Sequence, residues 1–165
     1  MIKRLFLAVL IALPAMAFAQ KFGIVNTNTI MSEMSDVKDA QTQLEAASKK
    51  YDDEFKALQG EMEKKYADLQ KAQEEKSPQT IIERRMSELQ ELDQKIQQFR
   101  QTAAQDLQRQ QEQLLAPIQQ KVINAINSVG AEGNYTMIFE NTSPVYVGSD
   151  VIDVTTAVKS KLGMK

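Results

Sequence analysis

Apolar residues recur at spacings of three and four over a long central stretch, from Val37 to about Pro117. In its first half two interleaved series repeat every seven residues, at Val37, Leu44, Tyr51 and Leu58 and at Phe55, Met62 and Leu69. A similar stripe continues in the second half from Ile82 to Leu114. A narrow apolar stripe on a charged, Gln-rich surface is typical of helices that pack along one seam. The pattern therefore predicts two long helices that form an antiparallel hairpin.

The turn of this hairpin is predicted at Lys76-Ser77-Pro78-Gln79. Ser77 can cap the second helix, and Pro78 prevents the first helix from continuing. Each arm of roughly 40 residues would extend about 60 Å. The second stripe drifts from a strict seven-residue repeat, so we expect loose winding. Gly60 costs about 1 kcal/mol relative to Ala, and it is either simply tolerated or lets the arm bend.

Short strand patterns lie at the two ends of the chain. Phe22–Val25 reads as one strand, and Tyr135–Glu140 and Val145–Gly148 read as a β-hairpin that turns at 141–144. Between the arm and these strands, the helix is expected to resume beyond Pro117. It should end near Gly130–Gly133, where Gly takes the capping position. A closing helix, capped by Asp153, carries Val154, Val158 and Leu162 along one side and ends at Gly163.

The predicted β-hairpin is apolar on both faces, and the local helices can cover only one of them. A second copy of the chain is the simplest cover for the other face. A small body that has three short strands would also be marginal alone. The candidate oligomerisation residues are Phe22, Ile24, Met137, Ile138, Phe139, Val145 and Val147.

These elements predict an α+β fold in which a body built from both chain ends carries a projecting helical hairpin. The expected organisation is a signal peptide at 1–19, a small α/β body formed by 20–36 plus 118–165, and an arm at 37–117 with its tip near 76–80. Lys3 and Arg4, an apolar run that ends at Ala15 and the Ala17-Phe18-Ala19 pattern predict cleavage after Ala19. The apolar run is too short to span a membrane. The alternative is a buried N-terminal helix.

Composition limits the chemistry. The 165 residues include no Cys, His or Trp, which excludes thiol and imidazole catalysis and argues against zinc, copper or haem. No nucleophile–base pair is evident, so we expect neither an enzyme nor a bound cofactor. A net charge of −2 gives no electrostatic reason to bind nucleic acid.

Three stretches resemble the Skp/OmpH family of periplasmic chaperones: Phe22–Asn26, the two-arm helical middle, and the end of the chain from Tyr135 to Val158. The resemblance implies a jellyfish-like homotrimer whose bodies share a small β-barrel and whose arms enclose a cavity. It implies an ATP-independent periplasmic holdase for unfolded outer-membrane proteins, with the outer-membrane assembly machinery as a further partner. The absence of a Gly-x-x-x-x-Gly-Lys-Ser/Thr loop agrees with ATP independence.

Apolar side chains outside the seam are the candidates for client contact: Met62, Tyr66, Met86 and Phe99. Met suits promiscuous surfaces because its side chain is flexible, although each of the four residues could instead belong to the seam. The family's best-known members have strongly basic arms. Here residues 41–76 carry 7 basic and 9 acidic residues. A small basic cluster, Lys76, Arg84 and Arg85, is a candidate for lipid contact.

A structural coiled-coil envelope protein or assembly subunit without chaperone activity is the alternative function. It would favour rigid arms with a strict repeat, whereas this stripe drifts and contains Gly60.

Overall fold

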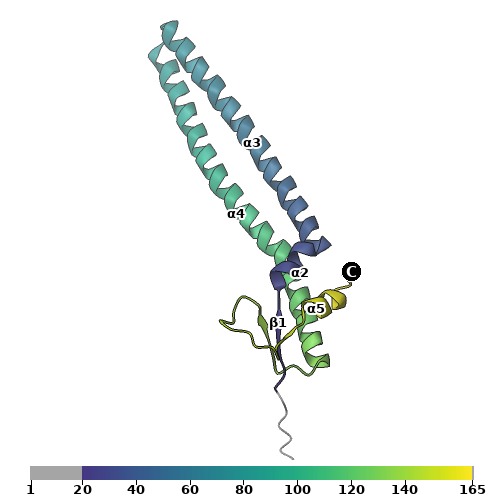
Figure 1. Cartoon of the computed structure of the whole chain (residues 1–165). Coiled ribbons are helices and arrows are strands. Elements are labelled where there is room, and N and C mark those ends of the chain that lie inside the picture. Colours follow the sequence, from purple (N-terminus) through teal and green to yellow (C-terminus); the bar gives the residue numbers. More distant parts are fainter. Residues whose placement is uncertain (1–19, 165) are drawn as a thin grey trace, which may run out of the picture. The chain divides into compact units, whose positions relative to one another are not determined.

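A computed structural model describes residues 20–164 (Figure 1). The elements in order are β1 (Phe22–Val25), α2 (Thr27–Glu33), α3 (Ser35–Glu74), α4 (Gln79–Glu132), β2 (Met137–Glu140), β3 (Ile152–Asp153) and α5 (Thr155–Lys161). The described residues form two compact units. One is Asn28–Ile123, and the other combines the residues up to Thr27 with those from Asn124 onward. The predicted signal peptide lies outside the described residues. The predicted α+β fold with a long helical hairpin is confirmed.

The first unit is dominated by α3 and the longer part of α4, which lie side by side and antiparallel (Figure 1). The 40 residues of α3 span about 60 Å at 1.5 Å per residue. The apolar stripe includes Leu58 and Leu69 but not Ala40 and Ala72, so it predicts only part of the buried positions. On α3 these are Ala40, Leu58, Leu69 and Ala72, and on α4 within this unit they are Leu92, Ile96, Ala103, Ile118 and Val122.

The predicted turn at 76–79 is confirmed, because α3 ends at Glu74 and α4 begins at Gln79. Ser77 N–H donates to the Ala72 carbonyl at 2.9 Å, and Lys76 N–H donates to the Gln73 carbonyl at 3.1 Å. This is the C-terminal capping pattern in which one residue takes a left-handed conformation. Here Lys76, with φ 51°, takes it in place of the usual Gly. The N–H groups of Ile81 and Ile82 then donate to the Pro78 carbonyl.

The interruption that we expect at Pro117 is absent, since α4 runs through it to Glu132. Proline removes one backbone donor and crowds the carbonyl four residues earlier, here that of Gln113. Both Pro117 and Gln113 are exposed, so water can bond the carbonyl that loses its partner. The helix therefore tolerates a residue that sequence reasoning treats as a boundary.

The end of α4 corrects a second expectation. A residue in the left-handed conformation does follow the helix, but it is Asn134, with φ 51°, rather than a Gly. Tyr135 N–H donates to the Gly130 carbonyl at 3.0 Å, which completes the cap. A Cβ at Gly133 would overlap the Tyr135 ring, so the absence of a side chain matters there for packing.

The sheet differs most from the prediction. Its order is β2-β1-β3, and both outer strands run parallel to β1, with Phe22 beside Met137 and Gly23 beside Ile152. The predicted β-hairpin is therefore wrong, and Val145–Gly148 is not a strand. Backbone bonds occupy both edges of β1, from Asn141 N–H to the Val25 carbonyl at 2.9 Å and from Val154 N–H to the Ile24 carbonyl at 2.8 Å. The central strand is β1, so β2 and β3, which follow it by more than 100 residues, pair with β1 rather than with each other.

One face of this sheet packs inward. Ile138 lies within contact distance of the positions that a Cβ would take at Gly23 and Gly130, which brings the sheet against α4. The buried core of this unit is Val25, Ala125, Val129, Val154 and Val158. The predicted closing helix is confirmed as α5: Thr155 N–H donates to Asp153 Oδ1 at 2.8 Å, and Gly163 follows it with φ 74°.

Candidate binding and assembly surfaces

The half of the arm nearer the tip is held by an apolar cluster between the two helices. Leu58, Leu92 and Ile96 are buried, and Phe55, Met62 and Phe99 pack against them. We call these six residues the distal cluster. Each position follows the spacing of three and four that places side chains on one helical face.

The four candidate client-contact residues separate into two pairs. Met62 and Phe99 belong to the distal cluster. Tyr66 and Met86 are 56% and 47% exposed and lie on α3 and α4 of the same hairpin. The structure therefore leaves an aromatic side chain and a flexible thioether side chain open to solvent on the arm.

A shallow groove of about 480 Å³ runs beside Tyr66 on the arm. We call it the arm groove. It is lined by Met62, Tyr66, Leu89, Gln90, Asp93 and Gln94. The mixture of apolar and amide side chains suits weak contacts with many sequences rather than one tightly held ligand.

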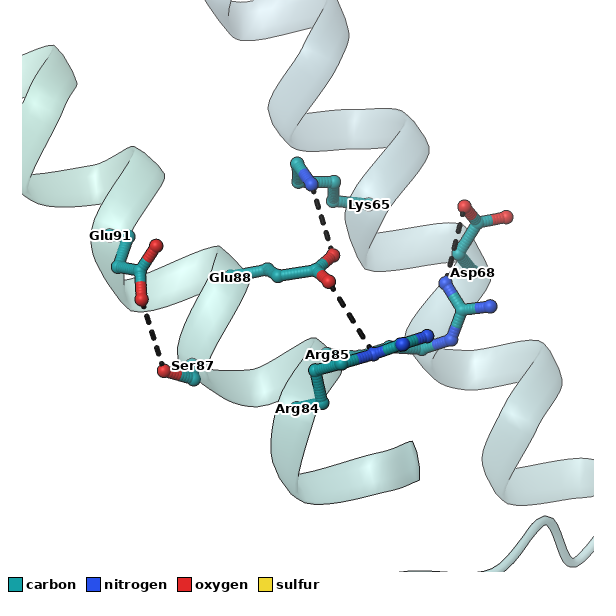
Figure 2. A network of polar contacts seen from close by, with 7 residues as sticks. All are labelled: Lys65, Asp68, Arg84, Arg85, Ser87, Glu88 and Glu91. Atoms are coloured by element: carbon teal, nitrogen blue, oxygen red, sulfur yellow. Dashed lines mark hydrogen bonds and ion pairs between the residues drawn. The ribbon is translucent and has the colours of Figure 1, made fainter. Parts of the chain in front are cut away.

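Near the tip, charged side chains link the two helices (Figure 2). Lys65 Nζ lies 3.1 Å from Glu88 Oε2, and Arg84 Nε lies 3.6 Å from the other oxygen of Glu88. Arg85 reaches back to Asp68 at 3.5 Å. Two of the three candidate lipid-contact residues, Arg84 and Arg85, thus already have carboxylate partners, whereas Lys76 is exposed at the turn.

Two carboxyl groups have pKa values below their ordinary range. The hydrogen bond from Lys65, together with its charge, lowers the pKa of Glu88. The hydrogen bond from Lys121, at 2.8 Å, lowers the pKa of Asp36 at the start of α3. Both carboxyls are well solvated, so their ion pairs contribute little to stability.

Sequence reasoning missed a polar contact inside the seam. Tyr51 OH on α3 donates to Asp106 Oδ2 on α4, and Gln110 Nε2 donates to the same oxygen at 2.7 Å. Arg109 bonds the other oxygen of Asp106. The Asp106 side chain is only 18% exposed. The sequence does show that a polar residue, Asp106, follows Ala103 at the spacing of the apolar stripe. It does not show that Tyr51 on the other helix faces it.

In the other unit, the outer face of the sheet is only partly covered in the described chain, since Met137 and Phe139 are exposed. Phe22, Ile24, Met137 and Phe139 share this face, and the rings of Phe22 and Phe139 lie 6.4 Å apart. A groove of about 500 Å³, here called the sheet groove, is lined by Phe22, Ile24, Phe139, Ser143, Pro144, Tyr146, Val147 and Val151.

The seven candidate oligomerisation residues are not all equivalent. Ile138 faces inward, toward α4, whereas Met137 and Phe139 are exposed. Val145 is fully exposed, and Val147 lines the sheet groove. Tyr146, which the sequence did not single out, is also largely exposed.

Within residues 20–164, no cluster of three or more acidic side chains is placed to hold a metal ion. None of the helices in this part of the chain is both long enough and apolar enough to cross a bilayer.

An antiparallel helical hairpin, together with a three-stranded parallel sheet assembled from both chain ends, defines an α+β protein. A family profile described as "Outer membrane protein (OmpH-like)" matches residues 21–162, and the chain belongs to this family. Among solved structures, the chain is similar to "a putative outer membrane chaperone (OmpH-like)" from Caulobacter crescentus CB15. The TM-score is 0.75 at 14% identity, over 87% of this chain and 83% of that one. A search of curated proteins finds no match.

Proposed function

We propose that this protein is an ATP-independent periplasmic holdase that binds unfolded outer-membrane β-barrel proteins between the arms of a homotrimer. Membership in the OmpH-like family supports the chaperone class. The observation that carries the proposal is the exposed pair Tyr66 and Met86 on a long helical arm whose other large apolar side chains are mostly used in the seam.

The arm suits a holdase physically. A protein that binds unfolded chains lowers their free concentration, and many weak contacts allow it to accept different sequences. Tyr66, Met86 and the arm groove offer apolar contact without a deep, shape-selective pocket. Met62 and Phe99 would contribute from the edge of the distal cluster. Charge plays a small part in this account because the arm is nearly neutral.

The trimer is proposed from the partly exposed outer face of the sheet. Phe22, Ile24, Met137 and Phe139 present a contiguous apolar surface beside the sheet groove. Soluble monomers rarely expose such a patch without a partner. Val145 and Val147 extend the surface along the neighbouring loop, while Ile138 supports it from the inner side. Cleavage after Ala19 and export to the periplasm, as the sequence predicts, complete the proposal.

The same proposal includes contact with lipid phosphates through Lys76, Arg84 and Arg85. The ion pairs of both arginines leave Lys76 as the side chain best placed to meet a phosphate. We also propose that the client passes from this protein to the outer-membrane assembly machinery.

Dilution of a urea-unfolded β-barrel protein into buffer, followed by light scattering, tests the holdase activity. We expect a threefold molar excess of chains to suppress aggregation without nucleotide. Unchanged scattering would favour the alternative, a structural coiled-coil protein of the envelope.

Equilibrium sedimentation tests the assembly separately. We expect the mass of three chains at micromolar concentration. Phe139→Arg should shift the mass toward one chain because it places a charge on the outer face of the sheet. A wild-type mass of one chain would contradict the trimer.

A further inference from the structure

The middle of the arm lacks the buried contacts found on either side of it. We define this region as residues 41–54 of α3 and 104–117 of α4. On α3 the buried residues Ala40 and Leu58 flank it, and on α4 Ala103 and Ile118 do so, but no residue inside either range is buried. Leu44 on α3 and Leu114 on α4 are only half-buried. Two better-packed parts of the hairpin are therefore separated by a loosely packed middle.

The contact between Tyr51 and Asp106 lies in this middle region. Asp106 continues the spacing of Leu92, Ile96, Phe99 and Ala103, and so it occupies a seam position where an apolar residue is expected. The apolar stripe continues beyond Ala103 at Leu107 and Leu114. The ring of Tyr51 contacts the ring of Phe99, with centroids 6.0 Å apart, and its hydroxyl bonds Asp106.

Asp106 is held from both helices. Tyr51 approaches from α3, whereas Gln110 and Arg109 approach from α4. Of these bonds, only the one to Tyr51 joins the two helices. Removal of this single hydroxyl would leave Asp106 bonded to its own helix alone.

We propose that the Tyr51–Asp106 contact is a latch that keeps the middle of the arm closed and that opens locally, without opening the distal cluster. Opening returns the hydroxyl and the carboxylate to water, which solvates them well, whereas opening the distal cluster exposes apolar side chains. The middle should therefore open more often than the part near the tip. When this contact opens, the arm bends at Tyr51 and Asp106.

This inference deepens the proposed function and rests on it in one respect: a bend at the latch would let arms of one length enclose clients of different size. The conformational claim itself is independent of client binding. Its test can therefore fail while the holdase activity stands, and the reverse also holds.

Amide hydrogen exchange on the whole protein, read by mass spectrometry, tests the latch. We expect Tyr51→Phe to speed exchange about tenfold in residues 44–54 and 104–113, the size expected for losing one hydrogen bond to a charged acceptor. Exchange in 58–69 and 89–99 should stay at its wild-type rate. Phe retains the ring contact with Phe99, so only the hydroxyl is lost.

Asp52→Asn is the control because it changes an exposed polar side chain directly beside Tyr51 on the same helix. It should leave exchange unchanged everywhere. A second variant, Tyr51→Leu combined with Asp106→Leu, replaces the polar layer with an apolar one and should slow exchange in the middle below the wild-type rate.

Three results would overturn the latch. They are wild-type exchange in Tyr51→Phe, faster exchange over the whole arm in that variant, and faster exchange of the middle in the double-leucine variant. Aggregation suppression measured on the same samples separates the two proposals. Suppression without the exchange effect rejects the latch alone, and the exchange effect without suppression rejects the holdase alone.

Discussion

The arm and the sheet-containing unit achieve their stability in different ways. Along the arm, many half-buried and buried positions each contribute a small amount, and the helices tolerate Gly60, Pro117 and a polar layer at Tyr51. The sheet-containing unit depends on a few fully enclosed side chains, such as Val158 at 0% exposure, and on the pairing of distant segments. A single substitution in the long seam should therefore affect stability less than one in the small core of the sheet-containing unit.

The sharpest test of this contrast is a buried charge. Val158→Asp would place a carboxylate without a partner in the core of the sheet-containing unit, and we expect a loss of more than about 4 kcal/mol in the free energy of unfolding. Thermal unfolding followed by circular dichroism would measure it. Thr156→Asp, an exposed change two residues earlier, should stay within about 0.5 kcal/mol of wild type. A Val158→Asp protein as stable as wild type would break the contrast.

A cavity in the distal cluster should cost less. Leu92→Ala removes a side chain that is 4% exposed, and we expect about 2–5 kcal/mol of destabilisation in urea unfolding. The result should lie toward the low end because the neighbouring arm positions can relax. Ile123→Ala, at a half-exposed position of α4, is the control and should cost under about 1 kcal/mol. Equal losses for the two variants would show that the distal cluster is no core.

Gly60→Ala should have a smaller and opposite effect. Apart from the neighbouring residues and backbone of the same helix, no atom lies within 4 Å of the position that the new Cβ would take, so the methyl group fits and helix propensity improves. We expect about 1 kcal/mol of stabilisation. A decrease in urea midpoint would mean that the arm needs Gly60 for a conformation that differs from the straight helix.

The smallest effect concerns pH. Because the pKa values of Glu88 and Asp36 are lowered in the folded protein, their contribution is present above the unfolded-state pKa and is lost as pH falls through the folded-state pKa. Melting temperatures between pH 7 and pH 3 should therefore fall slightly less in Glu88→Gln than in wild type. A larger fall in the variant would contradict the assigned direction.

The sequence predicted those features that depend on local spacing. The apolar repeat identified both helices of the arm. Pro78 marked the start of α4, and Asp153 marked the start of α5. The repeat also separated seam residues such as Leu58 from the exposed Tyr66.

Features that depend on pairing between distant residues could not be read in this way. A strand pattern at Val145–Gly148 suggested a hairpin, but β1 pairs on both edges with segments more than 100 residues away. Asp106 carried no signal that Tyr51, 55 residues earlier, would donate to it. Arg85 and Asp68 meet only because the turn fixes the register of the two helices. The division of the client-contact candidates into seam and surface pairs likewise required the register.

The holdase proposal is tested most directly by aggregation of an unfolded β-barrel protein in the presence of Tyr66→Ala combined with Met86→Ala. The two exposed side chains contribute little to folding, so the free energy of unfolding of the variant should lie within about 1 kcal/mol of the wild-type value. We expect wild type to suppress light scattering and the variant to require several-fold more protein for the same suppression. Gln98→Ala, which changes an exposed polar side chain of α4 outside the arm groove, should behave as wild type. Suppression by the double variant equal to that of wild type would contradict the proposed client surface, and no suppression by either protein would contradict the holdase function.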